Sequence, residues 1–295
     1  MLELSFEKEV VKTLTTGSNQ WVERKDLYGA TPDQLWANFR DKLNNNNYAK
    51  LQGHPLTDTE FNQVKRAIEV RTPYEAAKLL AAENGIGKVE VERDDAKLGT
   101  VTLELFWKAD VAGGKSSYEV VRQAVRPRLA GTQDVDPDRR FDVTLLINGL
   151  PLIQLELKKA TVELNQAFNQ IEKYAQEGKY TGIYSLLQMF VIMTPDSTAY
   201  FANAEPDHFN KAFLFNWRTR DNHPVENGLA FTRQVLNIPM AHKMVSEYTV
   251  IDQERQSLIL LRPYQIYAIE AVMHRIHDHQ DGFVWHTTGS GKTLT

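Results

Sequence analysis

Phe141-Asp142-Val143-Thr144-Leu145-Leu146-Ile147 is followed by Asn148-Gly149 and then by Leu152-Ile153-Gln154-Leu155-Glu156-Leu157-Lys158. Both runs are rich in the β-branched and apolar residues that favour strands. An Asn-Gly pair between two such runs is a strong short-range signal for a β-hairpin. We therefore predict two antiparallel strands that meet at this pair.

Three polar groups interrupt the apolar hairpin: Asp142 on the first arm, and Glu156 and Lys158 on the second. Because side chains alternate along a strand, Glu156, Lys158 and Gln154 share one face. Two carboxylates that face each other across a hairpin provide the hard oxygen ligands that Mg²⁺ prefers. A lysine beside them can orient a metal-bound water for attack on a phosphodiester. The alternative interpretation is a solvated amphipathic strand.

The register of the hairpin tests this interpretation. A strict two-residue turn at Asn148-Gly149 pairs Asp142 with Leu155, which puts Asp142 and Glu156 on opposite faces of the sheet. A shared site requires one extra residue on one arm. We therefore predict either a three-residue loop that includes Leu150 or a β-bulge.

The flanking sequence alternates between helical and strand patterns. Thr31 before Pro32, and Thr57 three residues before Glu60, are typical helix starts. We predict helices around Phe6–Leu14, 32–43, 73–82, 118–125 and 161–175, the last with Thr161 as its cap, and a further helix that starts at Thr57. We also predict strands at 89–92, 101–105 and 187–193, a polar loop at 44–47, and connecting structure over 196–250. Strands with helices before and after them imply an α/β fold in which helices flank a mixed sheet.

The chain ends on a phosphate-binding pattern: the apolar run Phe283-Val284-Trp285, then His286 and Gly289-Ser290-Gly291-Lys292-Thr293. In such a loop backbone N–H groups cradle phosphate oxygens, Lys292 reaches the outer phosphates and the Thr293 hydroxyl binds Mg²⁺. A strand is expected at 283–285. Because the helix and the acidic strand that complete the site do not follow, we expect the chain to be the N-terminal part of a larger ATP-driven protein.

Composition limits the classes of function. The 295 residues contain 42% apolar residues, eight His and no Cys, so disulfides and thiolate metal sites are excluded. No run approaches the length of a membrane helix, which indicates a cytoplasmic protein that does not act at a membrane. A net charge of −4 shows no overall nucleic-acid signature, so DNA contacts need local basic residues. The candidates are Arg122, Arg126, Arg128, Arg139, Arg140 and Lys159, and each has a solvated charge as its alternative.

The Asp142…Glu156-x-Lys158 pattern resembles the PD-(D/E)xK nuclease superfamily. The helix after the hairpin carries Gln170 and Tyr174 four residues apart, beside its apolar stripe. This pair is similar to the Gln-x-x-x-Tyr motif of RecB-like and restriction nucleases, where it helps position DNA; its alternative is an ordinary polar flank. Superfamily members often place an acidic residue on the first helix beside the metals, which makes Glu7 a candidate, with a surface-edge glutamate as the alternative.

The terminal motif, with His286 at its first position, resembles helicase and translocase superfamily 2. Upstream, Leu261–Glu270 is similar to the segment that precedes the P-loop of that superfamily, with Gln265 matching the residue that reads adenine. In this order the three motifs are similar to the R subunit of type I restriction enzymes. The resemblance implies domains at 1–195 (PD-(D/E)xK endonuclease), 196–255 (connecting region) and 256–295 (start of a RecA-like ATPase).

The same resemblance implies an activity. R subunits cleave double-stranded DNA after ATP-powered translocation and act with modification and specificity subunits. Asp142 and Glu156 would then bind Mg²⁺, Lys158 would be catalytic, and Gln170 and Tyr174 would assist. ATP would contact the residues Gln265, Gly289, Ser290, Gly291, Lys292 and Thr293.

Two other functions are open. The first is a non-catalytic DNA-binding or assembly module with a degenerate nuclease fold. The presence of Asp142, Glu156 and Lys158 favours catalysis, because a degenerate site would be expected to have lost one of them. The second is an ATPase alone, which the incomplete nucleotide site disfavours.

Overall fold

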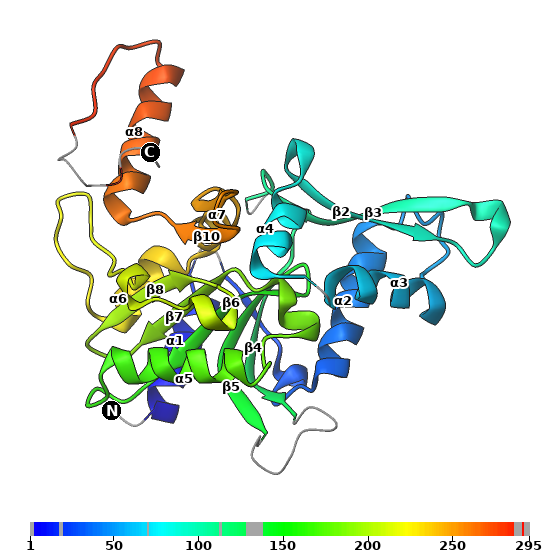
Figure 1. Ribbon diagram of the computed structural model, residues 1–295, viewed down its shortest axis with the longest axis horizontal. Coiled ribbons are helices and arrows are strands. Elements are labelled where there is room, and N and C mark those ends of the chain that lie inside the picture. The colour runs from blue at the N-terminus through cyan, green and yellow to red at the C-terminus, as the bar shows by residue number, and fades with distance from the viewer. Residues whose placement is uncertain are drawn as a thin grey trace.

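A mixed six-stranded sheet forms the centre of the molecule (Figure 1). The computed structural model describes residues 3–17, 20–69, 71–111, 114–127, 138–285 and 291. The strand order is β1-β4-β5-β6-β7-β8; β1 runs parallel to β4 and β6 parallel to β7, and the other neighbours are antiparallel. The strands are β1 Val22–Glu23, β4 Tyr118–Arg126, β5 Arg139–Ile147, β6 Leu150–Leu157, β7 Met189–Met193 and β8 Thr198–Ala202.

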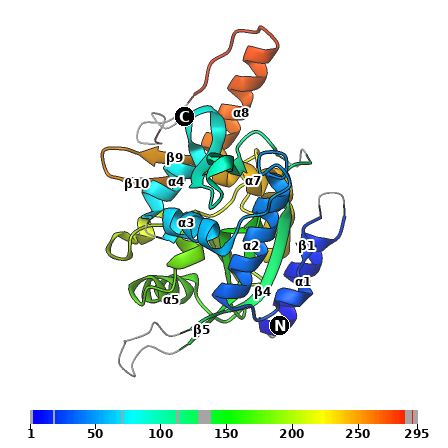
Figure 2. The same cartoon turned by 90° about the vertical axis from the view of Figure 1, so that its right-hand side faces the viewer.

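Helices cover both faces of this sheet, as the two orthogonal cartoons show for α1 and α5, which lie on opposite sides (Figures 1 and 2). The helices are α1 Glu3–Thr15, α2 Pro32–Asn46, α3 Asp58–Glu69, α4 Pro73–Ala81, α5 Leu164–Gln176, α6 Gly228–Val235, α7 Ile238–Ser246 and α8 Pro263–His277. Short 3₁₀ turns include Lys25–Leu27 and Gly182–Leu186. The predicted α/β architecture of a mixed sheet flanked by helices is thus confirmed.

The predicted hairpin is β5–β6. Ile147 pairs with Leu150 around a two-residue turn in which Asn148 has φ 55° and Gly149 has φ 79°. Consecutive positive φ values are the reason for an Asn-Gly pair in such a turn. A Cβ added to Gly149 would lie 2.8 Å from the Phe39 Cα, so α2 also requires glycine there.

A β-bulge follows the turn. Leu146 pairs with Pro151, but Leu145 pairs with Ile153, so β6 carries one extra residue, Leu152. The bulge is one of the two alternatives that the register argument predicted, and it is confirmed. The other alternative, a three-residue loop, is wrong.

The bulge sets the faces of the strands. Beyond it Val143 lies opposite Leu155, and the next position along each strand brings Asp142 beside Glu156 on one face. Glu156 is paired in parallel with Ile192 of β7, and Ile192 belongs to the apolar cluster under α5. Glu156 therefore faces α5.

The helix predicted at 118–125 is wrong, because this segment is strand β4. The apolar residues Tyr118, Val121 and Val125 have a helix-like spacing. In the fold β4 lies between β1 and β5, and Tyr118 to Val121 are buried without interruption. A strand that is buried on both faces loses the alternation that identifies it in sequence, and its pairing partners override local propensity.

Two helix boundaries also differ from the prediction. The predicted polar loop at 44–47 is wrong over its first three residues, because α2 continues to Asn46 and Asn47 is its C-cap residue. Thr161 does not cap α5; Glu163 occupies the cap position without a side-chain hydrogen bond. A turn closed by Val162 N and Lys159 O comes first and delays the helix start. The N-cap at Thr31 and the capping box at Thr57 form as predicted.

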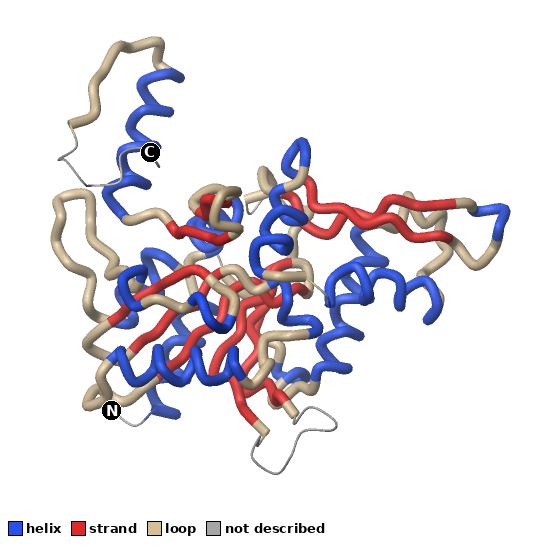
Figure 3. Tube along the Cα trace, viewed as in Figure 1, coloured by secondary structure: helices blue, strands red, loops and turns tan. Residues whose placement is uncertain are grey.

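The segment 196–250 holds more regular structure than predicted. It supplies β8 to the central sheet, together with α6, α7 and strand β9 (Thr249–Asp252), which pairs with β10 (Ser257–Leu260). These elements are short, so their periods are hard to recognise in sequence. The separate hairpin of β2 (Ile86–Glu92) and β3 (Thr100–Trp107) projects from the body, and α8 stands away from the sheet (Figures 1 and 3).

The strand predicted at Phe283-Val284-Trp285 is not formed. This segment is loop (Figure 3), and Phe283 and Trp285 are each 88% exposed. Within the described ranges no neighbouring strand pairs with it, so its backbone has no ladder to join. In the part of the chain that is described, no helix combines the length and apolar character needed to cross a bilayer.

Candidate active site

Hydrogen bonds join four of the predicted site residues. Lys158 Nζ lies 2.5 Å from Glu156 Oε1, and Gln170 Nε2 donates to the same oxygen at 2.5 Å. Gln170 Nε2 also donates to Tyr174 Oη at 2.8 Å. The end of β6 and one face of α5 thus meet at the Glu156 carboxylate, which is 2% exposed.

Asp142 completes the cluster from the neighbouring strand. Its Oδ2 accepts a hydrogen bond from Leu157 N at 2.8 Å, between Glu156 and Lys158 in sequence. This bond ties the first part of β5 to the last residue of β6. It holds the Asp142 carboxylate beside that of Glu156, as the metal-site hypothesis requires.

The two carboxylates destabilise each other's charged form. Burial, with the Glu156 charge added, raises the pKa of Asp142 well above its usual range. Burial also raises the pKa of Glu156, although Lys158 opposes the shift. For Lys158 burial acts to lower the pKa, but the Glu156 and Asp142 charges outweigh it and raise the pKa. The site therefore holds more negative charge than its own lysine neutralises.

The donor chemistry fits a divalent cation with oxygen ligands. Over the described ranges, neither Asp142 Oδ1 nor Glu156 Oε2 takes part in a hydrogen bond, so each carboxylate keeps one open oxygen. A group of three or more His, Cys, Asp or Glu side chains close enough to hold a metal does not occur among these residues. A cation here would bind to two carboxylates and complete its shell with water or substrate oxygens.

The structure places Glu7 in a different environment from the one predicted. Glu7 is buried, but its Oε1 accepts from Arg122 Nε at 2.7 Å and its Oε2 from Gln123 Nε2 at 2.6 Å. Both oxygens are thus engaged by β4 side chains. Glu3, one turn earlier on α1, is the residue of this helix whose charge raises the pKa of both Asp142 and Glu156. A spacing of four residues from Glu7 was the signal in the sequence that could have identified it.

The partner of Glu7 lies opposite the site in the sheet. Gln123 has φ 55°, an uncommon backbone conformation for a residue other than glycine. Its neighbours Arg122 and Ala124 pair with Val143 and Phe141, whereas Gln123 and Asp142 do not pair in the ladder. The ladder is therefore interrupted at Asp142.

Three predicted DNA-contact arginines are engaged inside the protein. Arg122 is bound by Glu7 and Glu23. Arg126 is buried; it donates to the Lys179 and Thr181 carbonyl oxygens and lies over the Tyr184 ring. Arg139 forms an ion pair with Glu177. Arg140 and Lys159 are exposed near the site, and Arg128 lies outside the described residues.

Most of the predicted nucleotide site lies outside the described residues: Gly289, Ser290, Lys292 and Thr293. Gln265 is 3% exposed; its Oε1 accepts from Arg262 N at 2.8 Å and its Nε2 donates to Gly291 O at 2.9 Å. Gly291 has φ 75°. Gln265 thus contacts the predicted phosphate loop.

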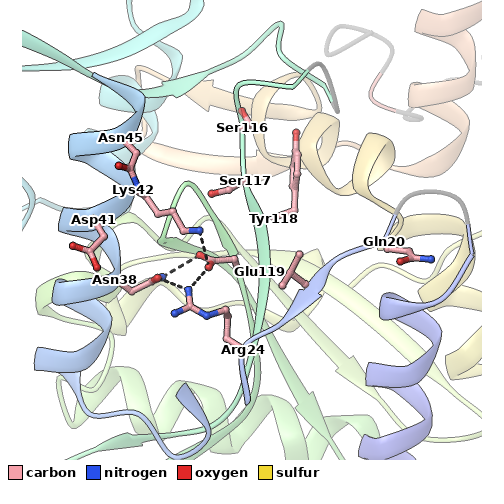
Figure 4. A pocket seen from close by; sticks show the side chains of 11 residues that line it. Gln20, Arg24, Asn38, Asp41, Lys42, Asn45, Ser116, Ser117, Tyr118 and Glu119 are labelled. Atoms are coloured by element: carbon pink, nitrogen blue, oxygen red, sulfur yellow. Dashed lines mark hydrogen bonds and ion pairs between the residues drawn. The ribbon is translucent and has the colours of Figure 1, made fainter. Parts of the chain in front are cut away.

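A pocket of about 540 Å³ lies between α2 and the sheet edge formed by β1 and β4 (Figure 4). Glu119 lies in it, with Arg24, Asn38 and Lys42 directed toward its carboxylate. The predicted catalytic residues do not line this pocket. Each oxygen of the carboxylate has a donor, which distinguishes this cluster from the Asp142–Glu156 site.

A mixed sheet with a buried carboxylate pair and an adjoining lysine defines a nuclease-like α/β domain. The chain belongs to the family described as Type I restriction enzyme R protein N terminus, whose model matches residues 5–209. Residues 264–295 match the SWI2/SNF2 ATPase family. The resemblance stated from the motifs is thereby confirmed.

Similar proteins are named as endonuclease subunits of type I restriction enzymes. This chain is 35% identical over 263 residues to the type I restriction enzyme SauCOLORF180P endonuclease subunit of Staphylococcus aureus (strain COL), covering 89% of this chain and 26% of that protein. The SsaAORF53P endonuclease subunit of Staphylococcus saprophyticus is 33% identical over 99% of this chain and 29% of its own length. The EcoprrI endonuclease subunit of Escherichia coli is 39% identical over 46% of this chain and 44% of that protein. The chain spans under a third of the two staphylococcal proteins.

Proposed function

We propose that this chain is the Mg²⁺-dependent endonuclease domain of an ATP-driven type I restriction enzyme R subunit, which hydrolyses phosphodiester bonds of duplex DNA after translocation. The observation that supports this best is the meeting of Asp142, Glu156 and Lys158 on one face of the β5–β6 hairpin. The raised pKa values of the two carboxylates indicate a site that gains from binding a cation.

In this proposal Asp142 and Glu156 hold Mg²⁺ through their open oxygens. When bound, the metal supplies charge neutralisation of the scissile phosphate and an acidified water. Lys158, positively charged and 2.5 Å from Glu156, orients the attacking water and offsets charge on the phosphate. Gln170 donates to Glu156 and to Tyr174, and so fixes the carboxylate and presents the α5 face to DNA.

The remaining roles follow from the family. We propose that ATP binds at Gln265 and the phosphate loop, and that modification and specificity subunits select the DNA target in the cytoplasm. Arg140 and Lys159, both exposed, contact the DNA backbone. The alternative of a degenerate, non-catalytic module is disfavoured by the geometry, because all three chemical groups are present and adjoining.

The test is cleavage by the complete R subunit assembled with its modification and specificity subunits. Asp142→Ala and Lys158→Ala are expected to lose cleavage while ATP-driven translocation continues at the wild-type rate. Glu90→Ala and Lys88→Ala, on the exposed side of the projecting β2–β3 hairpin, are the matched controls and keep both activities. If both site variants still cut DNA, the assignment is wrong.

A further inference from the structure

Arg139 joins the start of β5 to the end of α5. Its Nε lies 2.7 Å from Glu177 Oε2 and its Nη2 lies 2.5 Å from Glu177 Oε1, which is the two-pronged geometry of an arginine–carboxylate pair. Glu177 is the C-cap residue of α5, directly after Gln176. Both side chains are largely covered, with exposures of 18% and 14%. The pair therefore fastens the last turn of α5 to the edge of the hairpin.

The same arginine lies over Tyr174. The guanidinium carbon of Arg139 is 5.0 Å from the centroid of the Tyr174 ring, a distance at which a cation is attracted to an aromatic face. Tyr174 Oη accepts from Gln170, and Gln170 donates to Glu156. A continuous set of contacts thus runs from the Arg139–Glu177 pair to a carboxylate of the candidate site.

The end of α5 also has apolar contacts. Tyr174 and Ala175 are buried, and the Tyr174 ring lies 6.1 Å from the Phe141 ring, so the Arg139 contact adds to this packing. The Gln170 amide nitrogen donates both to Tyr174 Oη and to Glu156 Oε1. A shift of the Tyr174 ring therefore changes the orientation of the amide that donates to Glu156. Partners of this kind set the orientation of metal-binding carboxylates.

We propose that Arg139 and Glu177 are positioning residues for DNA cleavage: their ion pair holds Tyr174, and through Gln170 it fixes the orientation of the Glu156 carboxylate. This inference rests on the proposed nuclease function. It assigns Arg139 a role different from the DNA-backbone contact that the sequence suggested. It also adds Glu177, which no motif identifies.

Glu177→Gln separates the two roles of Arg139. If Arg139 contacts DNA, removing the neighbouring negative charge leaves the arginine freer to bind phosphate, and DNA binding is maintained or strengthened. If the pair positions Tyr174, Glu177→Gln weakens the two-pronged contact and lowers the cleavage rate as Arg139→Ala does. The substitution conserves side-chain size, so it limits any disturbance of folding.

The experiment uses the complete restriction complex with Mg²⁺, ATP and target DNA, and measures the cleavage rate at saturating Mg²⁺ and DNA. Arg139→Ala and Glu177→Gln are each expected to lower this rate about tenfold, at the lower end of the effects of residues that orient a metal site. The double variant is no slower than Arg139→Ala. In a Tyr174→Phe background, which lacks the hydroxyl link, neither substitution slows cleavage further. Lys173→Ala, which removes an exposed cation 4.0 Å from Glu177, is the matched control and cuts at the wild-type rate.

DNA affinity, its salt dependence, translocation and the melting temperature are measured on the same variants. The inference is overturned if Glu177→Gln cuts at the wild-type rate, or if Arg139→Ala weakens DNA binding and lowers the salt slope by about one, as loss of a phosphate contact does. It is also overturned if Arg139→Ala or Glu177→Gln lowers the cleavage rate of the Tyr174→Phe variant by the same factor as it lowers that of the wild type. Asp142→Ala in the same assay separates the two proposals: normal cutting by that variant removes the nuclease assignment itself, whereas its inactivity beside a normal Glu177→Gln removes only the positioning role.

Discussion

The side chains of Glu60 and Glu156 are almost equally inaccessible to solvent, at 1% and 2% exposed, yet their pKa values shift in opposite directions. For Glu60, burial favours a higher pKa, but the Arg93 guanidinium and the Thr57 and Asp94 amides outweigh it and lower the pKa. For Glu156, burial dominates over Lys158, and the pKa rises. The exposed fraction alone therefore does not distinguish a structural carboxylate from a candidate catalytic one; Glu156 also lies deeper in the protein than Glu60.

The supply of hydrogen-bond donors distinguishes them. Glu60 Oε1 accepts from Arg93 and from Asp94 N, and its Oε2 accepts from Thr57 N. Glu119 likewise receives donors on both oxygens, from Arg24 and Lys42 on one and Asn38 on the other (Figure 4). Glu156 receives two donors on a single oxygen and has a second carboxylate beside it. The fold satisfies the carboxylates that hold it together and leaves those of the candidate site partly unsatisfied.

Glu156→Gln gives the largest effect on activity. We expect cleavage by the assembled enzyme to fall about a thousandfold, because the loss of a metal ligand removes several kcal/mol of charge stabilisation in the transition state. Without metal, the same change removes a charge from a mutually repelling pair, so the melting temperature stays equal or rises. Single-turnover cleavage and thermal unfolding measure the two quantities. A variant that unfolds as readily as one lacking the Glu60–Arg93 pair would show that Glu156 is structural.

Arg93→Ala is the converse change and gives the largest effect on stability. It leaves the Glu60 carboxylate buried without its arginine, and removing one partner of a buried ion pair costs about 3–5 kcal/mol. Urea unfolding measures the loss. The control is Arg40→Ala, whose partner Asp58 is 91% exposed at its side chain and whose ion pair contributes no more than about 1 kcal/mol. Equal losses for the two arginines would contradict the comparison.

Local sequence signals predicted the hairpin of the candidate site and two of the helix starts. The Asn148-Gly149 turn, the bulge required for Asp142 to join Glu156, and the helix caps at Thr31 and Thr57 all depend on residues close together in sequence. The register argument succeeded because a one-residue slip moves a side chain to the opposite face.

Long-range contacts account for what the sequence did not show. The strand character of β4 depends on two pairing partners, and the Arg139–Glu177 pair joins residues 38 positions apart. The choice of Glu7 as a candidate on α1 did not anticipate Arg122, which lies 115 residues away and engages Glu7. Donor supply is a property of the folded chain, and no pattern within one segment reports it.

His242 extends the comparison to a buried basic group, for which burial favours the neutral form. Its side chain is fully buried. Its Nε2 lies 3.0 and 3.2 Å from the Trp107 and Lys108 carbonyl oxygens, so this nitrogen carries a hydrogen. Its Nδ1 lies 2.9 Å from the Tyr118 hydroxyl. Burial lowers the pKa of His242 below its ordinary value of 6.5. The contribution of the neutral His242 imidazole to the free energy of unfolding is therefore full above pH 6.5. This contribution is lost as the pH falls through the lower pKa of the folded state.

His242→Gln tests this dependence. The variant is expected to lose about 1–3 kcal/mol at pH 7.5, because two buried carbonyl oxygens lose a well-placed donor. Between pH 7.5 and pH 5 its stability falls less than that of the wild type, because the unfolded wild-type chain takes up a proton that its folded state resists. Urea unfolding at the two pH values measures the difference, in which the other titrating groups cancel. Parallel pH profiles would show that the imidazole is not held neutral.

Tyr180→Phe gives the smallest expected effect on stability and cleavage. It tests whether a second group without a full set of hydrogen bonds, the Tyr180 hydroxyl, belongs to the candidate site. The Tyr180 ring packs between Phe141 and Phe190, at centroid distances of 5.1 and 4.8 Å, and its buried hydroxyl has no hydrogen-bond partner among the described residues. Burial, with the Glu156 charge added, raises the pKa of this phenol well above its usual range, so it remains a proton donor.

Replacing a buried, unpaired hydroxyl with hydrogen removes its desolvation cost, so we expect the free energy of unfolding to stay equal or to rise by up to about 1 kcal/mol. Cleavage is expected to stay within about twofold of the wild type, because the Gln170 and Lys158 donors to Glu156 remain. A gain in stability with unchanged cleavage would show that the Tyr180 hydroxyl takes no part in cleavage, and that the Asp142–Glu156 pair holds the unsatisfied groups that do. A tenfold loss of cleavage at unchanged stability would mean that the hydroxyl finds its partner only in the reacting complex, and that the site extends beneath α5.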